Sequence, residues 1–172
     1  MKRLIILIMP LFLSSHYLVA QRVDTSGMEY KRLHKEVSTN VRITMRLIDS
    51  VCEAIFTLVT IPVRDGQTGD SLTFTGKHQP YLQESFQRLV PRLRSIDWRQ
   101  IFPDIKERDY DILLPYTYGF EAKECFDTLS TRAIKHKLSY ELHLRQGSRV
   151  PSYVLPAMGI TFWGRQWSKT GK

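Results

Sequence analysis

Few residues of this sequence have the types and the spacing that catalysis or metal binding requires. Beyond position 20 the histidines are scattered singly along the chain, as His34, His78, His136 and His143. The sequence also lacks a Gly-x-Ser-x-Gly elbow and a glycine-rich phosphate loop. We therefore expect a non-enzymatic protein with no catalytic residue, no cofactor and no metal ion.

Four acidic residues between positions 104 and 111 are the group most suited to hold a cation. They are Asp104, Glu107, Asp109 and Asp111. A calcium loop needs oxygen ligands at fixed short spacing and a glycine at its bend. No glycine lies between these residues, so the group does not indicate a calcium site.

Aromatic side chains are concentrated between positions 110 and 120, as Tyr110, Tyr116, Tyr118 and Phe120. Such a row can form a platform on which sugars or bases stack. At the spacing of a strand, however, aromatic residues more commonly pack in a core or pair across strands. We favour packing as the role of this row.

Two hydrophobic strands, a helix and a third strand would position these residues. The first strand is predicted over 53–63 and has apolar residues on both faces, which is typical of a central strand. Asp65-Gly66 predicts a hairpin turn, and residues 72–75 form the returning strand. The third strand spans 110–121 and alternates throughout. One of its faces carries Tyr110, Ile112, Leu114, Tyr116, Tyr118 and Phe120.

The predicted helices lie before and between these strands. Apolar residues recur at helical spacing after Pro80, at Leu82, Phe86, Leu89, Val90 and Leu93. Pro91 should split or kink that helix at Val90. Residues 28–50 also read as helical, with a possible break at 38–40, although 41–47 alternates and allows a strand. We expect Trp98, Ile101 and Phe102 to close one end of the core.

The last fifty residues predict an extension of the same domain. A short helix is predicted over 126–137, and residues 138–144 alternate as a strand that a return arm at 152–162 would pair with. The fold class is therefore α+β: a small antiparallel sheet, hairpin, helix and strand, packed against helices, with an extra C-terminal hairpin. We place the main domain at 21–124 and its extension at 125–172.

The first twenty residues resemble an export signal. Lys2 and Arg3 precede an apolar run at 4–13, and a more polar end leads to Ala20. The run is well short of the ~20 residues that span a bilayer, so cleavage near Ala20 is favoured over an anchor. The polar residues 21–27 are expected to form a flexible lead-in. The mature chain should be periplasmic or secreted, without a transmembrane segment.

The chain of 172 residues carries a net charge of +8, with 42% hydrophobic residues. These are ordinary values for a globular protein. A basic excess can attract anionic lipids, nucleic acids or acidic proteins. Because the basic residues form only short groups, we expect a solvated surface and no nucleic-acid partner.

Cys52 and Cys125 are the only cysteines. They lie just before the first predicted strand and just after the third, in a chain whose destination allows oxidation. If those strands are antiparallel neighbours, the two cysteines come close together, and a disulfide would add about 4 kcal/mol in the chain-entropy model. Two buried, unpaired cysteines are the alternative.

The order helix, hairpin, helix and strand behind an export segment resembles the C-terminal domain of TonB-type energy transducers. The residues that carry the resemblance are 54–59, Asp65-Gly66, the helix with Leu82, Phe86 and Leu89, and the closing strand 111–120. The resemblance implies a module that accepts an extended segment of an outer-membrane partner as an added strand. The partner-binding residues would be Ile112, Leu114, Tyr116, Tyr118 and Phe120. A C-terminal arm that pairs with the same strand would occupy that edge and prevent this mode of partner binding.

Two functions therefore remain open. The first is an exported interaction module that binds another envelope protein by strand addition. The second is a secreted protein that binds a small ligand or glycan, or a hydrolase, which would need a pocket with converging polar groups near Tyr116 and Tyr118.

Overall fold

The structure is a computed structural model of the chain, and it describes residues 21–41, 55–76, 80–121, 136, 139–140 and 150–163. Within these ranges the helices and strands alternate in an α+β order, as the sequence predicts. In chain order they are α1 (Met28–Asn40), β1 (Ile55–Arg64), β2 (Gln67–Thr68), β3 (Thr73–Gly76), α2 (Pro80–Gln87), α3 (Val90–Leu93), α4 (Trp98–Ile101), β4 (Tyr110–Glu121), β5 (Ser152–Val154) and β6 (Met158–Trp163).

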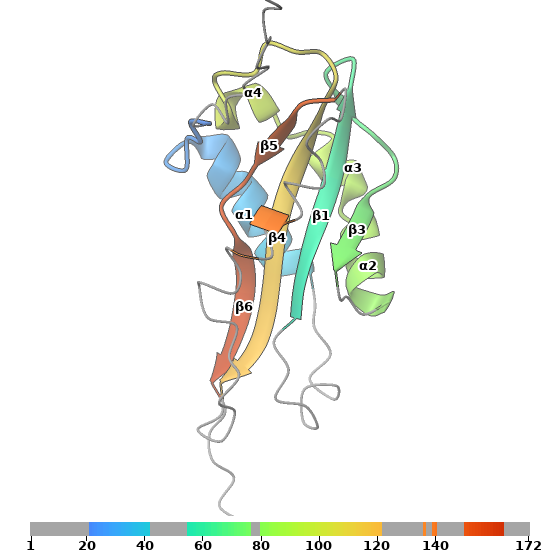
Figure 1. Ribbon diagram of the computed structural model, residues 1–172, viewed down its shortest axis with the longest axis vertical. Helices are drawn as coiled ribbons and strands as arrows, with labels where there is room; N and C mark the ends of the chain where they lie inside the picture. Colours follow the sequence, from blue (N-terminus) through green and yellow to red (C-terminus); the bar gives the residue numbers. More distant parts are fainter. Residues whose placement is uncertain are drawn as a thin grey trace, which may run out of the picture.

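The six strands form one sheet around the long antiparallel pair of β1 and β4 (Figure 1). Their register runs from Ile55 opposite Tyr118 to Val63 opposite Tyr110. The strands β2 and β3 pair with the other side of β1. The strands β5 and β6 follow one another along the other side of β4, and both run parallel to it. The sheet is therefore mixed.

The predicted α+β class is confirmed, but the prediction that the sheet is antiparallel throughout was wrong at its C-terminal strands. The return arm at 152–162 pairs in parallel with β4. Of the opposite arm predicted at 138–144, the structure describes Ser139 and Tyr140, and both are helical. A short alternating run does not by itself distinguish a strand from a helix, and it does not identify the strand with which a segment will pair.

The hairpin turn after β1 agrees with the sequence. Asp65 and Gly66 both have positive φ, at 51° and 76°, and Arg64 pairs with Gln67 across them. Two central residues in this conformation make a type I′ turn, whose twist matches that of the flanking strands. Further along, the Gly69 N–H donates to the Pro62 carbonyl at 2.8 Å, after which the chain leaves β1 and returns as β3.

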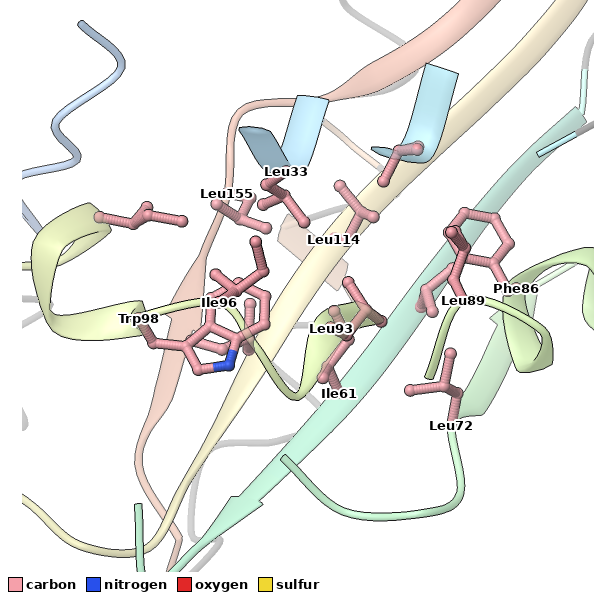
Figure 2. Packing of buried hydrophobic residues seen from close by; sticks show 14 of the residues in the cluster. Leu33, Ile61, Leu72, Phe86, Leu89, Leu93, Ile96, Trp98, Leu114 and Leu155 are labelled. Carbon is pink, nitrogen blue, oxygen red and sulfur yellow. The ribbon is translucent and has the colours of Figure 1, made fainter. Parts of the chain in front are cut away.

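All four of these helices pack against one face of the sheet. Figure 2 shows Leu33 of α1, Leu93 of α3 and Trp98 of α4 gathered over Ile61 and Leu114 of the two central strands. The predicted split at Pro91 is confirmed, because α2 ends at Gln87 and Pro91 occupies the first turn of α3, where its missing N–H costs nothing. As expected, Trp98, Ile101 and Phe102 are buried at one end of this core.

The opposite face of the sheet is apolar as well. Phe56 and Leu58 of β1 are buried there beside Leu113 of β4, with Val154 packed against them. The predicted character of β1, a central strand with both faces covered, is confirmed.

Several predictions fall on residues that lie outside the described ranges. These are the export signal at 1–20, most of the strand allowed at 41–47, the disulfide between Cys52 and Cys125, and most of the predicted helix at 126–137. They stay predictions.

Candidate functional site

The strand β4, which the sequence predicts as the partner-binding edge, has both of its backbone edges paired. Over 110–118 it pairs with β1, and its other side pairs with β5 over 111–113 and with β6 over 116–121. The β1 side is therefore paired over 112–118 and most of the other side is taken by β5 and β6, so little of the expected free edge at 112–120 remains. The alternation of a strand reports which of its faces is buried, but not whether it lies at the centre or the edge of a sheet.

The predicted partner-binding residues lie on β4, but they are already engaged within the fold. Ile112, Leu114 and Tyr116 are fully buried in the core beneath the helices. The backbones of Tyr118 and Phe120 pair with Ile160 and Phe162 of β6. The structure thus places all five residues on one strand, where Ile112, Leu114 and Tyr116 are buried and not accessible to a partner.

Tyr116 has the core role that we favoured for the aromatic row. Its ring meets that of Phe86 edge-on, with centroids 5.2 Å apart. Among the described residues no side chain or backbone group hydrogen-bonds its buried hydroxyl. Burial raises the pKa of this hydroxyl well above the ordinary tyrosine value.

The sheet ends instead at the backbone edge of β5 and β6 that faces away from β4, which we call the outer edge (Figure 1). On β5 the Pro151 carbonyl and the Leu155 N–H bond to β4. Because backbone groups alternate along a strand, the Ser152 carbonyl and the Val154 N–H point to the outer edge. In the described chain no strand pairs with this side of β5 or β6.

A single side chain binds two of the outward groups of β5. The side-chain amide of Gln21 donates from Nε2 to the Ser152 carbonyl at 2.6 Å and accepts at Oε1 from the Val154 N–H at 2.8 Å. A primary amide presents an N–H donor beside a carbonyl acceptor, the same two kinds of group that a backbone residue presents. Gln21 therefore satisfies this edge much as a neighbouring backbone would.

The lead-in at 21–27, which we expected to be flexible, is attached to the fold. Val23 packs against the core, and the Asp24 N–H donates to the Ile101 carbonyl at 2.8 Å. The Asp24 carboxylate accepts bonds from the Ser26 hydroxyl and N–H and from the Gly27 N–H at the start of α1. The bonds from Ser26, followed by that from Gly27, lower the pKa of Asp24. These anchors hold Gln21 beside β5.

The strand β5 is itself held in place through Tyr153. Its ring packs 5.5 Å from that of Phe102 and 5.6 Å from that of Tyr110, measured between centroids. Its hydroxyl donates to Glu107 at 2.6 Å. This bond lowers the pKa of Glu107, while burial and then the adjacent carboxylate raise the pKa of Tyr153.

The strand β6 approaches β4 closely at a glycine. A Cβ atom added to Gly159 would overlap the carbonyl and the hydroxyl of Thr117 on β4. Only glycine lets the two backbones come this near. Although Gly159 is exposed, its environment allows no side chain, and the path of the outer edge depends on it.

A pocket of about 580 Å³ lies beside the β1–β2 hairpin and is lined by Arg64, Gln67, Thr68, Gly69, Asp70 and Arg94. Its two arginines are each paired with a carboxylate, Arg64 with Asp111 and Arg94 with Asp70. The Arg64 guanidinium also donates to the Val63 and Tyr110 carbonyls. This pocket is lined by neither Tyr116 nor Tyr118, so it is not the one that the ligand-binding alternative requires.

Two other kinds of site are absent from the ranges that the structure describes. No three acidic, histidine or cysteine side chains there lie close enough to hold a metal ion together. None of the helices there has the length and apolar character needed to cross a membrane.

Comparisons of the chain with models of known protein families, with curated proteins and with solved structures find no match.

Proposed function

We propose that this chain is an exported, non-enzymatic interaction module that binds an extended segment of another envelope protein as an added strand on its sheet. The export pattern at 1–20 and the TonB-like layout motivate the proposal. The observation that carries it is the outer edge, because β5 already bonds to a peptide-like amide there. Main-chain hydrogen bonds along an open edge are the usual source of affinity in strand addition.

The outer edge replaces the β4 edge as the binding surface in this proposal. It combines β5 and the six residues of β6, a length of edge sufficient for several backbone bonds to a peptide. A sheet edge that no described strand covers is a ready template for another chain. Both strands are anchored to the centre of the sheet through β4, so an added segment would be coupled to the whole fold.

The test is site-specific photo-crosslinking in the envelope of the producing cell. A photo-reactive residue replaces Ala157, which is exposed between β5 and β6, or Gln83, which is exposed on α2 and serves as the matched control. We expect a defined protein adduct from position 157 and none of that size from position 83. Equal adducts from both positions, or none from 157, would contradict strand addition at the outer edge.

A second variant tests whether backbone bonds carry the binding. Val154→Pro removes an N–H that points away from β4 and leaves the Leu155 N–H bond to Leu113 in place. The adduct from position 157 should fall strongly in a protein whose circular dichroism is unchanged. An undiminished adduct in the folded variant would show that the contact does not use this edge.

A further inference from the structure

The positions of the two backbone groups that Gln21 binds on β5 indicate the direction in which an added strand would run. The Ser152 carbonyl and the Val154 N–H flank Tyr153, and both bonds converge on one small amide. In a parallel ladder, the N–H and C=O of a single residue bond to the two residues that flank its opposite number. In an antiparallel ladder the same two groups would bond to two different residues. The Gln21 amide therefore imitates one residue of a parallel strand.

From this we infer that the outer edge of β5 is a docking site for an extended peptide that runs parallel to β5, with one of its residues opposite Tyr153, and that the Gln21 side chain is a displaceable occupant of that site. The inference rests on the proposed function and adds to it the direction, the register and the competitor. The occupant is a peptide backbone, because the groups that Gln21 binds are one carbonyl and one N–H in strand geometry.

Gln21 is suited to displacement. Both of its hydrogen bonds lie at the exposed surface, where each contributes little net free energy because water competes. The anchors at Val23 and Asp24 do not involve the Gln21 side chain, so the amide can swing away while the rest of the lead-in stays bound. A peptide would replace both bonds and continue along β6.

The site is also prepared for an added strand. Tyr153 is held in place by ring contacts with Phe102 and Tyr110 and by its hydrogen bond to Glu107. The backbone on either side of it is consequently held in an extended conformation before any partner arrives. Preorganisation of this kind lowers the entropic cost of binding.

The experiment uses the full chain with the photo-reactive residue at position 157 and compares Gln21→Ala with Arg22→Ala. Arg22 is the exposed neighbour and serves as the matched control. We expect Gln21→Ala to increase the partner adduct about fivefold at limiting partner, since two weak bonds no longer compete. Arg22→Ala should leave the adduct unchanged. Amide hydrogen exchange at Val154 in the partner-free protein should become faster in Gln21→Ala alone.

Direction is read from the crosslinked residues of the partner. A probe at position 152 and a probe at position 157 should map to the partner in the same N-to-C order as in this chain. The reverse order, or an adduct that Gln21→Ala leaves unchanged, would overturn this inference while the proposed function survives. No adduct from position 157 in any variant would overturn both.

Discussion

The hydroxyl of Tyr153 donates a 2.6 Å hydrogen bond to the carboxylate of Glu107, and so joins β5 to the loop that follows α4. These residues are 46 positions apart. The bond fixes the short strand on which the candidate docking site is built. It also makes the stability of that strand dependent on the charge of one carboxylate.

Tyr153→Phe should lower the free energy of unfolding at pH 7 by about 1 to 2 kcal/mol, because a hydrogen bond to a charged group is lost. The pKa of Glu107 lies below its ordinary value of 4.5 in the folded protein. The contribution of the Glu107 carboxylate to the free energy of unfolding is therefore complete above pH 4.5, and it is lost as the pH falls through the lowered pKa. Urea unfolding at pH 7 and pH 3 should show a smaller acid loss in the variant than in the wild type. An identical acid loss in both proteins would contradict the role of this bond.

Tyr116→Phe should have the opposite effect on stability, although the chemical change is the same. The hydroxyl of Tyr116 is buried with no partner among the described residues, so its removal relieves an uncompensated polar group. We expect the free energy of unfolding to stay equal or to rise by up to about 1 kcal/mol. Thermal unfolding of both variants beside the wild type checks this, and a Tyr116→Phe protein less stable than the wild type would refute it.

Tyr116 also predicts a response to alkali. Because burial raises its pKa in the folded protein, the unfolded chain releases this proton first. Stability should then decline as the pH rises above the ordinary tyrosine value of 10.0. In Tyr116→Phe this part of the decline should disappear, which unfolding curves at pH 9 and pH 11 would measure.

Thr68→Val tests the link between the hairpin and the helices. The indole N–H of Trp98 donates to the Thr68 hydroxyl at 2.9 Å, and that hydroxyl donates to the Leu93 carbonyl at 3.2 Å. Valine has a similar shape but leaves the buried indole N–H unpaired, at a cost of about 1 to 3 kcal/mol. The matched control is Thr73→Val on the exposed side of β3, which should change stability by less than about 0.5 kcal/mol. Equal effects of the two substitutions in chemical denaturation would count against this arrangement.

Gly159→Ala should weaken the pairing of β6 with β4. The added methyl group meets the backbone of Thr117, and relieving such an overlap costs about 1 to 3 kcal/mol. Ala157→Ser, two residues earlier at an exposed position, serves as the control. Amide exchange should accelerate across 158–163 in Gly159→Ala and stay unchanged in Ala157→Ser. Unchanged protection in both would show that β6 tolerates a side chain at this position.

The parts of the fold that the sequence predicts well are those set by local chemistry. The turn at Asp65-Gly66 follows from residues that tolerate positive φ, and the break before Pro91 follows from its missing N–H. The buried face of β4 follows from alternation. Each of these features depends on neighbours in the chain, which a single sequence displays directly.

The candidate site could not be predicted in the same way. The order of the strands depends on where the chain returns after Glu121, and the alternation of apolar residues does not predict that path. The contact of Gln21 with Ser152 joins residues 131 positions apart. A polar glutamine in a polar lead-in gives no local sign of such a contact, so the outer edge became visible only once the strands were placed.

Amide hydrogen exchange of the complex between this chain and its crosslinked envelope partner tests the central proposal most directly. The account predicts stronger protection at the Val154 N–H and new protection along β6, with β4 unchanged because it is already paired on both sides. Protection that appears instead around the pocket of Arg64 and Arg94, with none over 150–163, would contradict strand addition at the outer edge.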